Sequence, residues 1–172
     1  DIKDAWHTRD LLDRLPFGSL GKNVLIDTSV KLIGVENIFL GDNVRIDAGT
    51  LIIATGRISI GSRVHIAANC YLEGRGGISI KSYANISNYV SIHSVSDDHS
   101  GQMMTNPMIP DAYKRLWSEE VEIGRHAIVF VKSTILPGSK IGDGAVVGAH
   151  SMAKGIIPAW TIVAGVPAIF IR

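Results

Sequence analysis

The segment at residues 93–101, HSVSDDHSG, places two histidines and two adjacent aspartates close together in the chain. Histidine is suited to take up a proton near neutral pH, because its unperturbed pKa lies close to that value. A neighbouring carboxylate can orient the imidazole ring and stabilise its protonated form. We therefore expect acid–base chemistry here, with His99, which follows Asp97 and Asp98, as the first candidate and His93 as an alternative.

The composition limits what this chemistry could serve. A chain of 172 residues with a formal net charge of +1 fits one domain, and its scattered Lys and Arg side chains give no reason to expect a nucleic-acid partner. No apolar run is long enough to span a membrane, and the N-terminal residues lack the apolar core of a signal peptide. The one cysteine, Cys70, cannot form an intramolecular disulfide, so we expect a protein of the reducing cytoplasm.

The segment at residues 93–101 interrupts a regular repeat. Aliphatic residues recur every six positions before it, in runs that begin every 20 residues, and recur again without a break after it. A helix would place apolar residues three and four apart and an ordinary strand would alternate them, so a strict period of six fits neither. The repeating positions are Leu20, Ile26, Leu32, Leu40, Ile46, Ile52, Ile60, Ile66, Leu72, Ile80, Ile86, Ile92, Ile123, Val129, Ile135, Ile141 and Val147.

Most of these aliphatic residues are followed four positions later by a small or β-branched residue. The pattern predicts a triangular coil with one short strand per side and turns at sequences such as GDN (41–43), GSR (61–63) and GDG (142–144). Stacked coils of this kind pair their strands in parallel and bury one apolar column. We therefore expect an all-β protein, a parallel β-helix over residues 20–172 with a loop inserted at residues 95–120.

The residues before the first coil predict a helix. Asp4 to Leu15 carries Leu11 and Leu12 on an apolar face, and Pro16 ends the pattern. The end coil of a stack exposes apolar surface and unpaired backbone groups. We therefore expect residues 1–19 to form a helical cap over that end.

The hexads LGDNVR, IGSRVH, IGRHAI and IGDGAV resemble the repeat unit of the hexapeptide-repeat, left-handed β-helix acyltransferases. The C-terminal stretch VVGAHSMAKGIIPAWTIVAGVPAIFIR is similar to that of the sugar O- and N-acetyltransferases of the maltose/galactoside acetyltransferase type. The resemblance implies a homotrimer that binds acetyl-CoA between adjacent prisms. It also implies acetyl transfer to a hydroxyl or amino group of a sugar, such as a nucleotide-linked sugar or a surface-polysaccharide precursor.

The resemblance places a catalytic histidine near the start of the inserted loop, about five residues after the last aliphatic of the preceding coil. That aliphatic is Ile92, and the matching position holds Asp97 rather than histidine. The base is then His99 in a longer loop, His93, or an aspartate (Asp97 or Asp98), and transfer assisted by the substrate alone stays open. A backbone N–H would stabilise the oxyanion, in a direct transfer within a ternary complex.

The same resemblance assigns the C-terminal coils to the donor. Small residues let the backbone approach the pantetheine arm closely, a lysine can pair with a CoA phosphate, and an indole can flank the adenine or cover the end of the stack. The donor candidates are Gly148, Ala149, Lys154, Trp160, Ala164 and Gly165, with Lys132 and Arg172 as other phosphate partners. For the sugar acceptor, the candidates are Asn69, Tyr71 and Asn88.

Two other classes of function compete with the transferase. A zinc enzyme resembling the γ-class carbonic anhydrases would use three imidazoles. The histidines at positions 65, 93, 99, 126 and 150 show no clear ligand set, and we expect no metal. The second competing class is a non-catalytic prism that uses the inserted loop as a binding surface. Cys70, at a small-residue position of the repeat, is predicted to face the coil interior rather than act as a nucleophile.

Overall fold

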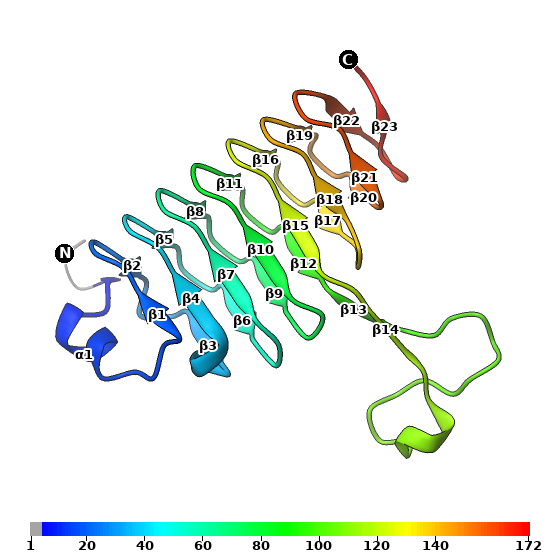
Figure 1. Ribbon diagram of the computed structural model, residues 1–172, viewed down its shortest axis with the longest axis horizontal. Helices are drawn as coiled ribbons and strands as arrows, with labels where there is room; N and C mark the ends of the chain where they lie inside the picture. The colour runs from blue at the N-terminus through cyan, green and yellow to red at the C-terminus, as the bar shows by residue number, and fades with distance from the viewer. Residues whose placement is uncertain (1–4) are drawn as a thin grey trace.

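Short strands alternate with tight turns along the computed structural model, which describes residues 5–172. Successive strands lie on three different faces, and each face is one parallel sheet, so the chain winds as a stack of triangular coils (Figure 1). Every third strand returns to the same face because one hexad fills one side of the triangle. The predicted left-handed parallel β-helix is confirmed.

The strands are grouped here by face. The first face contains β1 (Ser19–Leu20), β4 (Ile38–Leu40), β7 (Ile58–Ile60), β10 (Ile78–Ile80), β15 (Val121–Ile123), β18 (Lys140–Ile141) and β21 (Ile156–Ile157). The second contains β2 (Leu25–Ile26), β5 (Arg45–Ile46), β8 (His65–Ile66), β11 (Asn85–Ile86), β16 (Ile128–Val129), β19 (Val146–Val147), β22 (Ile162–Ala164) and the antiparallel β23 (Ile169–Phe170). The third contains β3 (Lys31–Ile33), β6 (Leu51–Ile53), β9 (Tyr71–Glu73), β12 (Ser91–His93), β17 (Thr134–Ile135) and β20 (Met152–Ala153).

The core is a column of aliphatic side chains inside the triangle. Ile38, Ile58 and Ile78 of the first face are paired in register, one above the other, and all three are buried. The hexad aliphatics of the other faces stack in the same way. Burying each such side chain contributes about 1.5–3 kcal/mol relative to leaving it exposed.

Two of the three corners need a residue with positive φ in almost every coil. The first corner, between the first and second faces, has Asn23, Asn43, Arg63, Tyr83, His126 and Trp160 in this conformation. The second corner, between the second and third faces, has Asn69, Tyr89, Lys132 and His150. The positive φ of His126 and His150 is therefore a requirement of the turn and does not depend on their side chains.

The third corner, between the third and first faces, takes the extra residues of the longer period. Gly34, with φ of 72°, leads there into the short 3-10 helix η2 (Val35–Asn37). Gly74–Gly77 turns at the same corner two coils later, with Gly77 at φ of 97°. The inserted segment leaves the prism at this corner as well, directly after β12.

The N-terminal helix is shorter than the sequence pattern predicts. Only α1 (Arg9–Asp13) is helical, capped by the Thr8 side chain and anchored by the buried Leu12. Ahead of it the chain pairs with the first coil, where Trp6 forms a bridge with Asp27, so hydrogen bonding to the coil edge replaces the expected helical turn. The part of the predicted cap at residues 1–4 lies outside the described residues, and the cap boundary at residue 19 stays a prediction.

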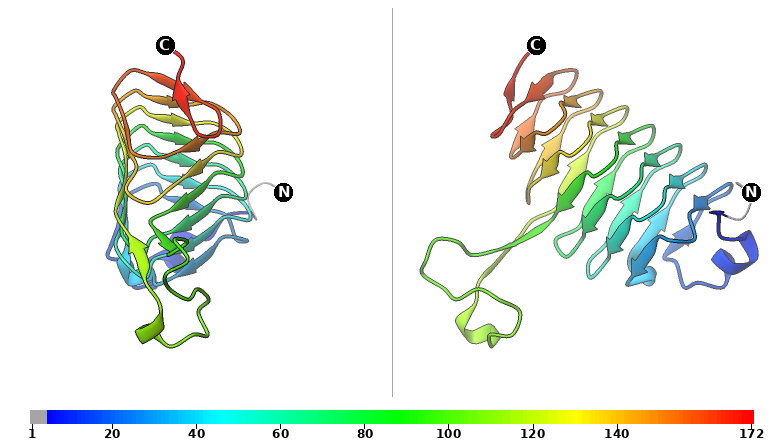
Figure 2. Two further views of the ribbon diagram at one scale, coloured as in Figure 1. Left: turned by 90° about the vertical axis from the view of Figure 1, so that its right-hand side faces the viewer. Right: turned by 180° about the vertical axis from the view of Figure 1, so that it is seen from behind.

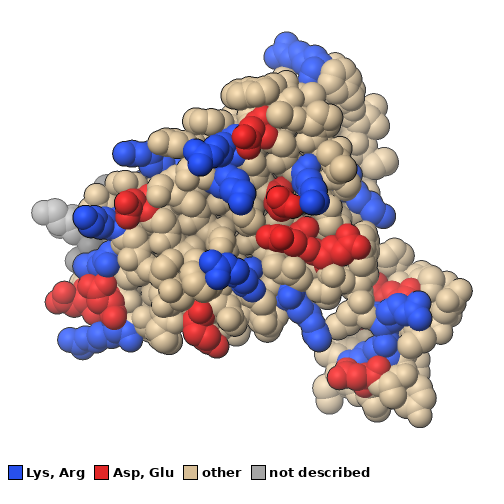
Figure 3. Space-filling view, in the orientation of Figure 1, with Lys and Arg blue, Asp and Glu red and all other residues tan. Residues whose placement is uncertain are grey.

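The insertion, here called the arm (residues 95–120), projects from the side of the prism (Figure 2). Its base is an antiparallel hairpin of β13 (Val95–Asp97) and β14 (Leu116–Ser118), and its tip holds the 3-10 helix η3 (Asp111–Tyr113). Beyond its base the arm stands clear of this prism, as the space-filling view shows (Figure 3). Met108 and Tyr113 are therefore exposed, at 87% and 60%. No helix within residues 5–172 is long and apolar enough to cross a bilayer.

Candidate active site

A cavity of about 500 Å³ opens where the arm leaves the third face; it is called here the base cavity. Its floor comes from the outer side of β9 and β12, and its wall from β13 and the returning strand of the arm. The lining residues are Thr55, Tyr71, Glu73, Arg75, His93, Val95, Ser96, Asp97, Pro107, Lys114 and Leu116.

The stacking of coils sets the floor of the base cavity. On the third face Ile33, Ile53, Glu73 and His93 are paired in register and form one row of outward side chains. Glu73 therefore stands between an isoleucine and a histidine. In the adjacent row, the Tyr71 ring lies 5.2 Å from the His93 ring, centroid to centroid, with the planes tilted by 39°.

Glu73 is the one side chain of the described residues with a buried oxygen or nitrogen that has no hydrogen-bond partner, and the atom is Oε2. Burial raises the pKa of this carboxyl group, an effect partly offset by the backbone N–H and the charge of Arg75. Its backbone carbonyl is fixed, since it accepts from the N–H of Ser94 at 2.9 Å and from Oγ of Ser94 at 2.8 Å. The carboxylate is thus held in place beside the cavity without a protein partner for Oε2.

His93 is half-buried beside Glu73. Burial lowers the pKa of its imidazole, because the charged form loses hydration, so the ring is neutral at pH 7 and able to accept a proton. Burial also raises the pKa of Tyr71, with a further contribution from the charge of Glu73, which keeps the phenol protonated. The base cavity therefore combines a proton acceptor, a hydrogen-bond donor and a carboxyl group.

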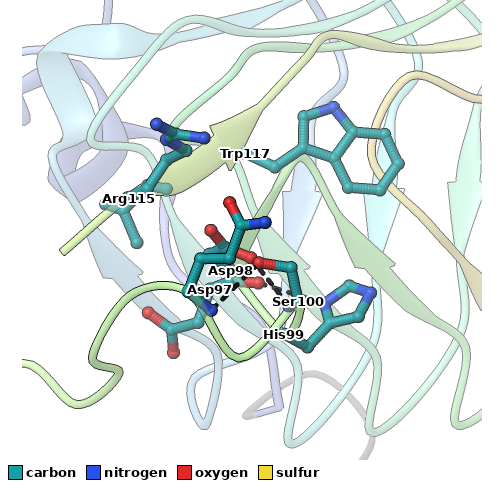
Figure 4. A pocket seen from close by; sticks show the side chains of 8 residues that line it. Asp97, Asp98, His99, Ser100, Arg115 and Trp117 are labelled. Atoms are coloured by element: carbon teal, nitrogen blue, oxygen red, sulfur yellow. Dashed lines mark hydrogen bonds between the residues drawn. The ribbon is translucent and has the colours of Figure 1, made fainter.

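A second cavity of about 480 Å³, called here the arm cavity, lies between the two sides of the hairpin (Figure 4). Arg115 and Trp117 line one side of it, and the segment from Asp97 to Ser100 lines the other; Gln102 and Leu116 complete it. Lys154, from the C-terminal coils, lies with Nζ 5.0 Å from the centre of the Trp117 ring.

The arm cavity contains His99, but not the carboxylate–imidazole pair that the sequence predicts. Nδ1 of His99 lies 3.2 Å from the backbone carbonyl of Asp97 instead. The Asp98 carboxylate accepts from the backbone N–H of Ser100 at 2.8 Å, and these hydrogen bonds lower the pKa of Asp98. The Asp98 carboxylate therefore caps a local turn instead of orienting the His99 ring. Asp97 lines both cavities and is exposed.

The donor candidates are distributed over all three corners. Gly148, Ala149, Ala164 and Gly165 gather at the second corner, where a Cβ atom on Gly148 would lie 2.8 Å from that of Ala164. Lys154 lies at the third corner.

Trp160 lies at the first corner, 74% exposed. Its indole rests on Gly144, where any Cβ atom would collide with it. A groove along the second corner of one chain therefore reaches the four small residues but neither Lys154 nor Trp160.

The acceptor candidates also divide. Tyr71 lines the base cavity, whereas Asn69 and Asn88 lie at the second corner, on the other edge of the third face. Asn69 has φ of 59°, and the backbone carbonyl of Asn88 accepts from the N–H of Lys132 at 3.0 Å, so both serve the turn.

The remaining histidines have structural surroundings. His65 lies 2.8 Å from a carboxylate oxygen of Asp47 and 3.1 Å from the amide oxygen of Asn85. His126 stacks on Tyr83, with ring centres 4.9 Å apart. Within residues 5–172 no group of three His, Cys, Asp or Glu side chains is arranged to hold a metal ion.

Glu73 and Lys114 were missed by the sequence reasoning. Glu73 could have been found, because aligning the chain at its 20-residue period puts a lone acid in a row with Ile33, Ile53 and His93. Lys114 carried no such signal. Its side chain is only 12% exposed, and its ammonium lies 3.0 Å from the exposed Asp111.

Comparison with solved structures extends over nearly the whole chain. AntD, an N-acyltransferase from Bacillus cereus, matches 98% of this chain and 90% of its own at 36% sequence identity, with a TM-score of 0.94. The protein belongs to the hexapeptide-repeat, left-handed β-helix acyltransferases. A single-substitution variant of AntD has been solved with dTDP-4-amino-4,6-dideoxyglucose and coenzyme A, and AntD itself with dTDP and 3-hydroxybutyryl-CoA. A maltose O-acetyltransferase from Clostridium difficile, at 22% identity and a TM-score of 0.63, shares the fold.

The curated relatives match over a shorter stretch. The dTDP-4-amino-4,6-dideoxy-D-glucose acyltransferase of Escherichia coli is 42% identical over 86 residues, which is 50% of this chain and 45% of that protein. The lipopolysaccharide biosynthesis O-acetyl transferase WbbJ of E. coli K12, a putative assignment, is 38% identical over 84 residues. The matches thus span about half of this chain and less than half of the curated relatives. No family model matches the sequence.

Proposed function

We propose that this acyltransferase moves an acyl group from acyl-CoA to the amino group of a nucleotide-linked sugar. The observation that carries the proposal is the near full-length likeness to AntD, which binds both a CoA and a dTDP-linked amino sugar. The E. coli relative named for the same sugar supports it. Acetyl-CoA is the donor that the sequence favours, and 3-hydroxybutyryl-CoA, bound by AntD, is the alternative acyl donor.

The transfer needs one proton acceptor and one oxyanion donor. The amine nitrogen attacks the thioester carbonyl carbon, the tetrahedral oxyanion collapses, and the C–S bond breaks to release CoA as its thiolate. The proton that the nitrogen loses passes to a base. We assign this role to His93 ahead of His99, because His93 is neutral at pH 7 and shares the base cavity with Tyr71 and Glu73.

A hydroxyl acceptor is the second candidate. The likeness to WbbJ over 84 residues supports it, since that relative is named as an O-acetyl transferase. A hydroxyl is a poorer nucleophile than a neutral amine and depends more strongly on the base. The two acceptors are therefore separated by their response to loss of His93, which affects transfer to oxygen more.

We place the active site at a boundary between subunits of a homotrimer in the cytoplasm. The arm supports this arrangement, because Met104, Met108 and Tyr113 expose apolar surface at its tip that a neighbouring prism would cover. The four small residues at the second corner offer a close backbone approach to a pantetheine arm laid along that edge. A thioester donor and one buried thiol, Cys70, suit a reducing compartment.

Calorimetric titration with CoA, followed by turnover, tests the proposal. The folded protein should bind CoA near one site per chain. It should then release thiol from acetyl-CoA or 3-hydroxybutyryl-CoA when dTDP-4-amino-4,6-dideoxyglucose is added, with an N-acylated product of matching mass. If the folded protein binds neither acetyl-CoA nor 3-hydroxybutyryl-CoA, the proposed transferase activity is excluded.

A further inference from the structure

The Glu73 carboxylate has only part of its hydrogen-bonding capacity used within the fold, by the backbone N–H of Arg75. The row it occupies on the third face is aliphatic at Ile33 and Ile53, and an isoleucine would continue that row. Glu73 takes part in none of the ion pairs of residues 5–172, and its Oε2 atom is buried without a hydrogen bond. A buried, unpaired carboxylate oxygen is unfavourable for folding, so its presence needs another explanation.

The charges around the base cavity leave this carboxylate free for a ligand. Lys114, the most buried cation of the wall, has its ammonium 3.0 Å from Asp111. Arg75, exposed on the coil corner after Glu73, lowers the pKa of that carboxyl through its backbone N–H and its charge but forms no ion pair with it, and Asp97 is exposed at the opposite side. His93 is neutral at pH 7. The unsatisfied negative charge on the cavity floor therefore belongs to Glu73.

We propose that Glu73 receives the protonated amino group of the acceptor sugar, an inference that rests on the proposed function. A primary ammonium in the base cavity presents three N–H donors to the carboxylate, and its charge offsets the unfavourable burial of Oε2. A cavity of about 500 Å³ is within the usual size range for small-molecule sites. Glu73 is then a specificity residue that favours amino sugars over the corresponding hydroxy sugars.

The arrangement also orders the reaction. The ammonium binds to Glu73, next to His93 in the same row. One N–H proton must leave before the nitrogen can attack, and neutral His93 accepts it and passes it to solvent, because the same imidazole takes up the second proton that the nitrogen loses on attack. The free amine then attacks the thioester carbon, while Glu73 keeps one hydrogen bond to the nitrogen.

The substitution Glu73→Gln tests this role, because it keeps the shape of the side chain and removes its charge. We expect the KM and the dissociation constant for dTDP-4-amino-4,6-dideoxyglucose to rise about 10- to 100-fold, the range for a hydrogen bond to a charged group. The KM for acyl-CoA should not change. The inhibition constant of the matching 4-hydroxy sugar, dTDP-6-deoxyglucose, should also stay within about twofold. Glu36→Gln, at an exposed position of η2, is the matched control.

The outcomes separate the inference from the proposed function. Unchanged amino-sugar affinity in an active Glu73→Gln enzyme would overturn the inference and leave the transferase standing. Equal losses for the amino and hydroxy sugars would also overturn it, because charge recognition affects only the former. A fall in thermal stability with unchanged affinity would show that Glu73 pairs with a neighbouring subunit instead. Amino-sugar binding that depends on Glu73 without acyl transfer would support the inference and exclude the proposed function.

Discussion

Cys70 shows at the level of one residue how the coil interior controls chemistry. The thiol is buried, and its Sγ donates to the backbone carbonyl of Ser87 at 3.1 Å. Burial raises the pKa of Cys70 to about 11, so the thiolate is absent at neutral pH. The nucleophile of a covalent acyl-enzyme route would have to be a different group.

We therefore expect Cys70→Ala to retain acyl transfer within about threefold, since the thiol packs as a small apolar group. The native protein should also resist Ellman's reagent at pH 8 and react only on unfolding. Steady-state kinetics and the time course of thiol labelling measure the two effects. Loss of turnover in a folded Cys70→Ala protein would contradict the direct transfer.

The protonation of His93 predicts a pH dependence with a definite sign. Because burial lowers the pKa of His93 below 6.5, the base stays neutral at pH 7 and above. The loss of this base should therefore lower the rate as the pH drops below about 6.5. Folding stability has the same sign, since a lowered pKa in the folded state gives a contribution that is present above pH 6.5 and is lost on acidification.

The profile of kcat/KM against pH, measured for His93→Asn and His99→Ala, identifies the base. Loss of the base should lower kcat by about 10² to 10⁴ and remove the acid limb. We expect this in His93→Asn, with His99→Ala close to the wild type. The reverse result would transfer the role to His99 and to the arm cavity.

Several residues singled out from the sequence line the two cavities, but not in the expected pairing. His93, His99, Asp97 and Tyr71 do line the two cavities. The expected bond between an aspartate and His99 does not form, because the Asp98 side chain bonds to the backbone two residues further on. A repeat pattern does not show which of two nearby hydrogen-bond partners a side chain will choose. It also does not show that the arm covers one side of Glu73.

The arm is the element that the sequence describes least. Its position could be predicted because the hexad register stops, but its hairpin base and its projection could not, since its apolar residues follow no period. All buried hydrophobic side chains of the described residues lie outside residues 95–120. We therefore expect the arm to contribute little to the free energy of unfolding of the prism.

Replacing residues 99–114 by Asn-Gly should leave the prism intact. Asp98 and Arg115 are joined by a backbone hydrogen bond of 3.0 Å, and Asn-Gly is the preferred two-residue turn between such strands. We expect a thermal midpoint within a few degrees of the wild type by circular dichroism, CoA binding retained, and acyl transfer lost. A large fall in the midpoint would show that the arm stabilises the prism.

For the whole molecule, the fold followed from the sequence because one periodic rule applies to every coil. Each coil contacts only its neighbours, so stability is a sum of similar local terms. The residues at the N-terminus lie outside this rule, and their helix is shorter than predicted. The pairing of Trp6 with Asp27 depends on an exposed coil edge, which a helical pattern at residues 4–15 does not reveal.

Ile86→Ala tests the continuity of the apolar column. Ile86 is fully buried between Ile66 and Val129, so truncation should lower the free energy of unfolding by about 2–5 kcal/mol. Ile156→Ala, at a side chain that is 79% exposed, should change it by less than about 0.5 kcal/mol. Urea unfolding of both variants gives the comparison, and equal effects would argue against a single core.

Light scattering decides the proposed assembly. A trimer has three times the chain mass of 18.5 kDa, and Met108→Asp, at the exposed tip of the arm, should weaken it if the tip contacts a neighbour. A monomer that still binds CoA and transfers acyl groups would remove the need for a site between subunits.

The third corner gives the fold a place where it can vary. A short 3-10 turn follows β3 there, a glycine turn follows β9 and the whole arm follows β12, yet the strands on both sides keep their pairing with the coils above and below. Insertions at this edge are accommodated without any change in sheet register. New substrate preferences can therefore evolve at one corner while the rest of the prism is inherited unchanged, and a foreign peptide grafted in place of the arm would be displayed on a rigid support.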